Sequence, residues 1–229
     1  MLPMSRFSEY RIIPVVGLFF LMLVMPRVEA QKSRHDKARA AAEHRFLNAL
    51  ASVAEKTNRS VIIEYKTSGQ FMLPAPIQLT MVKANADTAQ TITSMLASDK
   101  RFRVITDPDG TIMVVQHGMP QDVLDLRFNY VKLSDLQRFN PDLAMSAILE
   151  APEVKAYFKA HDIRLPVDLG GFINPVRPDL PHLPNVIENM TLLDAMKHII
   201  AVFHQTGTYK EEMDSRGRRV VAFGFVDAD

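Results

Sequence analysis

Three histidines near the C-terminal end of the chain are the residues that could ligate a metal. They are His182, His198 and His204. Metal ligands on a helix lie on one face, commonly four residues apart. His198 and His204 are six residues apart and therefore lie about 240° apart around a helix. Asp194 does share a face with His198, but an exposed helical Asp–His pair accounts for that spacing. We therefore expect no metal site.

A cluster of charges near the C-terminus could in principle perform acid–base chemistry. Glu211 and Glu212 are adjacent carboxylates, and three arginines follow them at positions 216, 218 and 219. Adjacent residues of a strand point to opposite faces, so the two carboxylates do not converge. Cross-strand ion pairs or a solvated hairpin tip explain these charges.

Other catalytic and cofactor signatures do not occur in the sequence. There is no Gly-x-Ser-x-Gly elbow, and Gly170–Gly171 follows no strand–helix signature and is interpreted as a turn. The chain has no cysteine, which excludes disulfides and thiolate chemistry. We assign no catalytic, cofactor-binding or metal-ligating residue, and we expect a protein that is not an enzyme and needs no cofactor.

The N-terminal residues 1–30 have the pattern of a secretory signal peptide. Arg6 and Arg11 precede an apolar run over 12–25, and Val28–Glu29–Ala30 is a small-x-small cleavage site. A membrane-spanning helix needs about 20 apolar residues, so this run is short for a permanent anchor, although an uncleaved anchor is the alternative. With no cysteine after the signal, a lipid anchor is excluded. We expect a periplasmic or secreted protein.

The charge balance argues against one class of partner. The chain carries 27 Lys and Arg and 26 Asp and Glu, a net charge of +1. The expected signal holds three arginines and two glutamates, so the mature chain is formally neutral. A nucleic-acid binder would carry a basic field, and we expect no nucleic-acid partner.

A helix–strand–turn–strand pattern occurs twice, over 87–116 and over 191–225. We call each copy a cassette. Thr88 maps onto Thr191 and Gly110 onto Gly217. Leu96 and Ile200 occupy corresponding places on the two helices, and both are expected to be buried.

The first half of the mature chain predicts two helices and four strands. The first helix has apolar residues at helical spacing from Phe46 and ends at Asn58, which tolerates a left-handed conformation. Asp87 begins the second helix with a capping box to Gln90. The predicted strands span 60–65, 76–83, 101–106 and 111–117, with a turn over 107–110.

The second half predicts an alternating strand, short helices, a loop and the second cassette. The strand carries Leu124, Leu126, Phe128 and Tyr130, and Ser134 and Pro152 begin short helices. Five prolines over 165–186 indicate a proline-rich loop. In the second cassette, over 190–226, Gly207 ends or loosens the helix, and the core face of the final hairpin is expected to hold Val220, Ala222 and Phe225.

Residues 43–117 resemble the short N-terminal (STN) signalling domain of secretins and TonB-dependent receptors. The resemblance rests on Leu47–Leu50 with Ala54–Asn58, on Val61–Tyr65, on Ile77–Leu79, on the 86–96 helix and on Gly110–Val115. Asn58 stands where the family usually has glycine. No pore-forming segment follows, so the secretin and receptor functions do not transfer. The resemblance implies protein–protein contact through a helix face or a strand edge.

These patterns together predict an α+β fold, with small mixed or antiparallel sheets, packed helices and two related helix–strand–strand cassettes in two sheet-and-helix layers. The expected organisation is a signal peptide (1–30), a charged lead-in (31–42), an STN-like domain (43–120) and a second α+β unit (121–229). We expect a non-enzymatic periplasmic docking, envelope assembly or signalling module with an envelope protein as partner, and membrane contact only if the signal is retained. The alternatives are an enzyme or small-ligand binder that uses the proline-rich loop as a lid, and an envelope scaffold.

Overall fold

The computed structural model describes residues 37–38, 40–67, 87–166 and 175–228, in two units, Met1–Ala41 and Ala42–Asp229. In the first unit, residues 37, 38, 40 and 41 are helical. The expected signal peptide, the predicted strand over 76–83 and Gly170–Gly171 lie outside the described residues. Every strand that the structure describes belongs to the second unit.

The second unit opens with a helix over 42–57, which we call the first helix. Phe46, Leu50 and Val53 are buried on one side of it, as their spacing predicts. The helix is followed by Asn58, whose φ of 50° confirms the predicted left-handed cap. Strand β1 (Val61–Thr67) starts three residues later.

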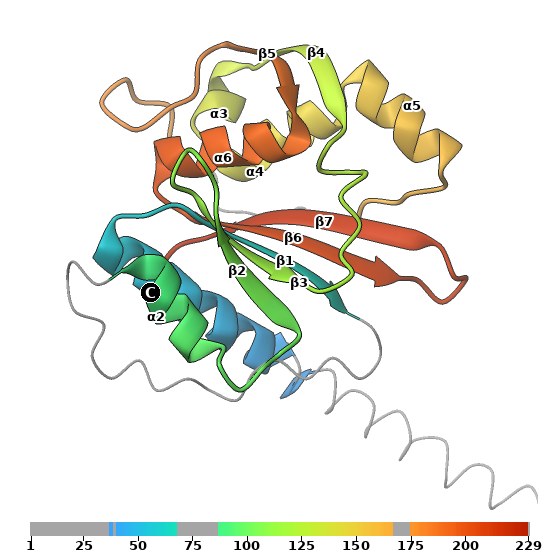
Figure 1. The fold of residues 1–229 in the computed structure, drawn as a ribbon. Coiled ribbons are helices and arrows are strands. Elements are labelled where there is room, and N and C mark those ends of the chain that lie inside the picture. Colours follow the sequence, from blue (N-terminus) through green and yellow to red (C-terminus); the bar gives the residue numbers. More distant parts are fainter. Residues whose placement is uncertain (1–36, 39, 68–86, 167–174, 229) are drawn as a thin grey trace, which may run out of the picture. The chain divides into compact units, whose positions relative to one another are not determined.

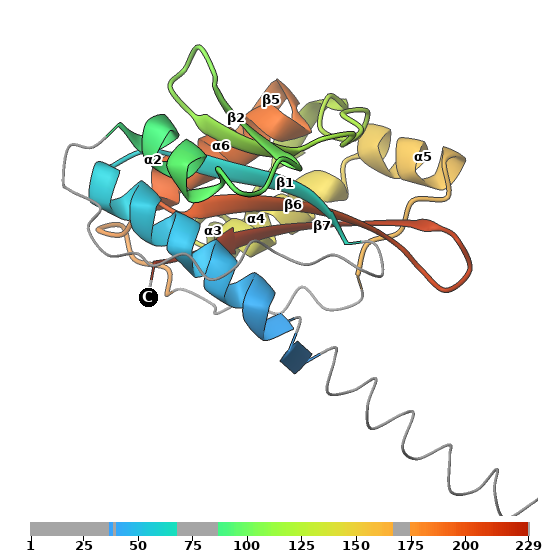
Figure 2. The same cartoon turned by 60° about the horizontal axis from the view of Figure 1, so that its bottom comes forward.

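Strand β1 lies at the centre of a five-stranded mixed sheet with the order β2-β3-β1-β6-β7. Its neighbours, β3 (Ile112–Gln116) and β6 (Thr206–Met213), both run parallel to it. The outer strands, β2 (Phe102–Thr106) and β7 (Arg219–Val226), close antiparallel hairpins. Figure 2 shows β1, β6 and β7 side by side. The helices and mixed sheets confirm the predicted α+β class.

Each face of the sheet carries its own hydrophobic core. Val61, Ile63 and Tyr65 of β1 pack with the first helix and with α2 (Thr88–Met95). Ile62 faces the opposite core, which is built from the C-terminal half of the chain. Figure 1 shows α2 and the first helix on one side of the sheet, and α4 and α6 on the other.

The C-terminal half holds one small sheet and four helices, and the sheet and three of the helices, α4, α5 and α6, contribute side chains to this second core. The antiparallel pair consists of β4 (Arg127–Lys132) and β5 (Val186–Thr191). The helices are α3 (Asp135–Arg138), α4 (Pro141–Leu149), α5 (Pro152–Ala160) and α6 (Leu192–Phe203). Ser134 caps α3 and Pro152 opens α5, as predicted. No helix in the described ranges combines the length and the apolar character needed to cross a membrane.

The two cassettes do not form two separate layers, because both hairpins pair with β1. In the first cassette the second strand, β3, lies against β1. In the second cassette the first strand, β6, takes that place. The segments 43–120 and 121–229, expected as two units, therefore contribute to one sheet within one compact unit, Ala42–Asp229.

The N-caps of the two cassette helices are as predicted, whereas the end of α6 differs. Thr191 caps α6 with a full capping box to Asp194, and Asp87 caps α2 by accepting from the backbone N–H of Gln90. Helix α6 ends at Phe203, because His204 adopts a left-handed φ of 57°, and Gly207, predicted to end or loosen the helix, lies in β6. Gly110 and Gly217 both have positive φ, 86° and 73°, as their turns predict.

Two strand faces also differ from the prediction. In β7 the buried side chains are Val221 and Phe223, not Val220 and Ala222, because the register with β6 places them opposite Glu211 and Tyr209 on the core face. In β4, Phe128 is buried as expected, but Tyr130 is 52% exposed. The error in β7 follows from assigning a face from alternation alone, which leaves the choice of face open. In β4 the two buried residues, Phe128 and Val131, are three positions apart, so burial does not alternate there.

Candidate functional site

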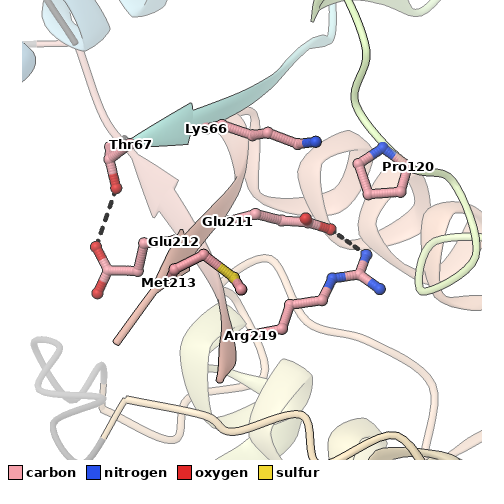
Figure 3. Close-up of a pocket in the computed structure, with 7 residues that line it drawn as sticks. All are labelled: Lys66, Thr67, Pro120, Glu211, Glu212, Met213 and Arg219. Carbon is pink, nitrogen blue, oxygen red and sulfur yellow. Dashed lines mark hydrogen bonds and ion pairs between the residues drawn. The ribbon is translucent and has the colours of Figure 1, made fainter. Parts of the chain in front are cut away.

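A cavity opens where the parallel strands β1 and β6 end. In sheets with parallel strands, ligands commonly bind outside the carboxyl ends of the strands. The cavity has a volume of about 480 Å³. Figure 3 shows its lining, which consists of Lys66, Thr67, Pro120, Glu211, Glu212, Met213 and Arg219. We call it the strand-end cavity.

Two of the lining residues, Glu211 and Arg219, belong to an ion-pair network centred on Arg219. Its guanidinium donates to both carboxylate oxygens of Asp122, at 2.6 and 2.8 Å, and to Oε1 of Glu211. Tyr209 donates its hydroxyl to the same Glu211 oxygen, and Tyr157 donates to Oδ2 of Asp122 at 2.8 Å. The network thus joins β6, β7, α5 and the segment between β3 and β4.

In three members of the network the pKa is shifted further from neutral pH. The hydrogen bond from Arg219 lowers the pKa of Asp122 to about 2. Burial and the bond to Glu211 raise the pKa of the Tyr209 hydroxyl, and the bond to Asp122 raises the pKa of Arg219. Groups shifted away from neutrality are poorly suited to exchange protons there.

Several polar atoms remain open toward the strand-end cavity. Glu211 is only 5% exposed, and no described residue donates to its Oε2. Lys66 uses one of its three donors on the carbonyl of Gly118, at 2.7 Å. The exposed carboxylate of Glu212 accepts from Thr67 at 3.0 Å. Beside them Met213, 67% exposed, and Pro120 provide apolar surface.

A buried carboxyl group on β1 holds the segment that carries Pro120 and Asp122. Glu64 of β1 is 1% exposed and accepts from Nε2 of Gln121 at 2.7 Å. Burial raises the pKa of Glu64. This contact places the segment after β3 against the central strand.

The outer edge of β7 is a second surface feature, and it is only partly covered. Arg164 donates its N–H to the carbonyl of Arg219 and accepts from the N–H of Val221, both at 2.9 Å, in a parallel bridge. The next N–H of a strand in this register would come from residue 166. That residue is Pro166, which has no N–H, so the pairing stops there.

Beyond Val221 the edge is free within the part of the chain that the structure describes. Backbone direction repeats every second residue of a strand, so the N–H groups of Phe223 and Phe225 point to the same outer side as that of Val221. No described residue bonds to them. From Val220 to Val226 the strand has neither charge nor proline, which are usual means of protecting an edge.

The structure places the two glutamates and the arginines of the β6–β7 hairpin partly as the sequence predicted. Glu211 and Glu212 lie on opposite faces, one buried and one exposed. Arg218 pairs with Asp214 at 2.7 Å near the hairpin tip. Arg219 pairs with Glu211 of β6, a cross-strand ion pair as predicted, and it also pairs with Asp122 outside the hairpin, which the sequence did not predict.

The three late histidines do not meet. His182 stacks on Phe139 with ring centroids 4.9 Å apart, His198 lies on α6, and His204 follows its end. Over the described ranges, no three His, Asp or Glu side chains converge as ligands of a metal do.

The later part of the proline-rich loop packs on α3. Leu183 is fully buried, donates to the carbonyl of Arg138 at 2.9 Å and accepts from its Nε at 2.8 Å. The segment around Leu183 is thereby fixed to the second core.

Sequence reasoning missed Lys66, Pro120 and Asp122. Only one signal was available, the spacing of Tyr209 and Glu211, which places them on the same face of one strand. Asp122 lies 97 positions from its partner Arg219, and no local pattern predicts such a contact.

No family model matches this chain, and comparisons with curated proteins and with solved structures find no match either.

Proposed function

We propose that this protein is an exported, non-enzymatic docking module that binds an extended segment of an envelope protein at the free edge of β7. The observation that carries this proposal is the unpaired and uncharged edge beyond Val221. Unpaired backbone groups on a sheet edge bind another strand through main-chain hydrogen bonds.

The bridge at Arg164 gives the direction of the bound segment. Arg164 pairs with β7 in parallel, so a strand that continues this ladder also runs parallel to β7. Two copies of β7 related by a two-fold axis would run antiparallel. A partner protein therefore fits this edge better than a second copy of the chain does.

Side chains on both faces of β7 define the chemistry of the partner segment. Phe223 and Phe225 lie on the face toward the second core, and Ala222 and Val226 lie on the other face. Apolar side chains on both faces favour an uncharged segment rich in β-branched or aromatic residues.

Two expectations from the sequence support the same function. The resemblance of residues 43–117 to the STN domain implies protein–protein contact, and the N-terminal pattern of residues 1–30 implies export. N-terminal sequencing of the protein recovered from the periplasm or medium should then begin at Gln31.

A charge placed on the β7 edge tests docking. Ala222→Glu puts a carboxylate opposite Lys210, a favourable cross-strand pair, so the sheet should tolerate it. The matched control is Ile105→Glu on the opposite edge strand β2, where the side chain is already 37% exposed. A partner captured from envelope extract by the wild-type mature protein should be lost with Ala222→Glu and kept with the control.

Hydrogen exchange locates the contact. Partner binding should slow exchange of the amides of Phe223 and Phe225, because these donors are open in the free protein, and should leave β2 unchanged. Capture that survives Ala222→Glu would disprove strand addition at β7. A self-association that only Ala222→Glu abolishes would replace the partner by a second copy.

A further inference from the structure

We infer that the segment bound at the β7 edge carries an aromatic side chain at the position beside Gly224, with a β-branched residue before and after it. This inference rests on the proposed strand addition and specifies the sequence that the edge selects. It follows from the register of the open ladder, from the missing side chain at Gly224 and from the side chains on the two faces of β7.

The bridge at Arg164 fixes the register of any strand that continues the same ladder. Arg164 donates to the carbonyl of Arg219 and accepts from the N–H of Val221, so it lies level with Val220. The bonds of a parallel ladder repeat every two residues. A position two steps further along the ladder is therefore level with Gly224.

Backbone groups on both sides of Gly224 are available to a residue at that position. The residue would donate its N–H to the carbonyl of Phe223 and accept from the N–H of Phe225. Within the described ranges, neither group has a partner on this side of β7. The position beside Gly224 thus lies at the centre of the open edge.

Gly224 leaves the backbone of β7 uncovered at this position. Thr208 of β6 lies opposite it, and a Cβ at position 224 would meet Thr208 Oγ1 at 2.9 Å. The close approach of Thr208, which is 8% exposed, accounts for the glycine within the sheet. The consequence at the edge is a partly exposed backbone without a side chain. An aromatic side chain on a neighbouring strand stabilises a glycine of this kind by covering it.

The neighbours of Gly224 on the same face leave room for a ring. They are Ala222 and Val226, two residues before and after it, and both are partly exposed. Ala222 carries only a methyl group. A ring beside Gly224 can therefore lie on its backbone and contact the two neighbouring side chains, which lie at diagonal positions.

The opposite face of β7 selects a different kind of side chain. Phe223 is 6% exposed, and Phe225 is partly buried at the margin of the second core. Segment residues beside these two rings point to the same face as the rings do. Pairs of an aromatic and a β-branched residue stabilise neighbouring strands. The expected core of the partner segment is thus β-branched, aromatic, β-branched.

Two peptides test this pattern. One is acetylated and amidated Thr-Val-Phe-Val-Thr, and the other has alanine in place of the phenylalanine. Each is titrated into isotope-labelled mature protein and followed by NMR. Both should shift the amides of Phe223 and Phe225, and only the phenylalanine peptide should shift the Hα protons of Gly224 through its ring current. The phenylalanine peptide should bind at least about fivefold more tightly, as expected for partial burial of a ring.

Variants connect the preference for phenylalanine to Gly224. Gly224→Ala combined with Thr208→Ala adds a methyl group to β7 and removes the hydroxyl that this methyl group would meet. The preference should then fall below about twofold, because the backbone is already covered. Thr208→Ala alone is the matched control and should keep the full preference. Amide spectra of both variants check that the sheet is intact.

The outcomes separate this inference from strand addition itself. Equal binding of the two peptides, with shifts at Phe223 and Phe225, would overturn the aromatic position and leave strand addition in place. A preference for phenylalanine that persists in the double variant would also overturn it, since the ring would then bind elsewhere. Failure of both peptides to shift the β7 amides, or binding that survives Ala222→Glu, would overturn strand addition and this inference with it.

Discussion

At the scale of single residues, Arg219 joins parts of the chain that are distant in sequence. It contacts Asp122, 97 positions earlier, and Glu211, eight positions earlier. The side chains of Arg219 and Glu211 are 21% and 6% exposed. A charge is costly to bury without a partner, so these pairs determine where the segment before β4 meets the β6–β7 hairpin.

Protonation of Asp122 should weaken this arrangement in acid. Its pKa is about 2 in the folded protein, below the ordinary 3.8, because Arg219 bonds to the carboxylate. A lowered folded pKa contributes stability above the unfolded value and loses it as the pH falls through the folded value. The free energy of unfolding should therefore decrease between about pH 4 and pH 2. The side chain is 38% exposed, so solvent screening limits the size of the effect.

Asp122→Asn isolates this contribution in urea titrations across that pH range. Asp214, whose pKa is also about 2, remains in both proteins and cancels in the comparison. The variant should be less stable than the wild type at pH 6, and the difference should shrink toward pH 2. A difference that stays constant with pH would mean that Asp122 contributes no titrating charge to stability.

At the scale of elements, α6 connects the two cassettes. Its Lys197 donates to Asp107 and lies 3.1 Å from Asp109, both in the turn of the first cassette. Ile200 of α6 is fully buried. Leu96, its counterpart in the first cassette, is 5% exposed, so both predicted core positions are confirmed as buried. The helix thus packs against the sheet while it holds the opposite hairpin.

Gly207 allows α6 to lie this close to the sheet. A Cβ at this position would meet Met196 Cε at 3.0 Å, and Ile200 Cγ2 and Ile62 Cγ1 at 3.2 Å. Gly207→Ala should therefore lower the free energy of unfolding by about 1–3 kcal/mol through overpacking. Ile200→Ala alone should lower the free energy of unfolding by ~2–5 kcal/mol. The double variant should lose less than the sum of the two single losses, because Ile200→Ala removes one of the methyl groups that the new Cβ would crowd. Additive costs in urea titrations would contradict the close contact.

At the scale of the whole molecule, β1 links the two halves of the chain. It pairs with β3 from the first cassette over four positions and with β6 from the second over seven. The sheet cannot be divided between 43–120 and 121–229 without breaking one of these ladders. The hairpins attach to β1 in opposite strand order, so the repeat in sequence is not a repeat in topology.

Unfolding should therefore occur in one transition. Urea unfolding can be followed by far-UV circular dichroism and by the fluorescence of a single tryptophan. The tryptophan replaces Phe102 in one variant and Phe223 in another, so that each cassette has its own probe. The unfolding midpoints from all three signals should coincide, as two-state unfolding requires. Two separated midpoints would support two independent domains at 43–120 and 121–229.

Some parts of the fold follow from residues close together in sequence. The cap at Asn58, the capping box of Thr191 and Asp194, the turns at Gly110 and Gly217, and the start of α5 at Pro152 were predicted and are present. The opposite faces of Glu211 and Glu212 were predicted as well. Each depends on backbone preferences and hydrogen bonds within a few residues, which the local sequence determines.

Only the tertiary structure decided which strands are neighbours and what forms the strand-end cavity. The alternation of apolar and polar residues along a strand identifies its two faces. The order of the strands depends instead on hydrogen bonds between backbone groups, which every residue except proline carries in the same form. Strand order is therefore hard to predict from the sequence. The placement of β1 between β3 and β6 brings Lys66 beside Glu211, and Thr67 to Glu212, 145 positions away. The sequence by itself determined the caps, turns and fold class of this protein, whereas its binding surfaces arise from contacts between distant segments.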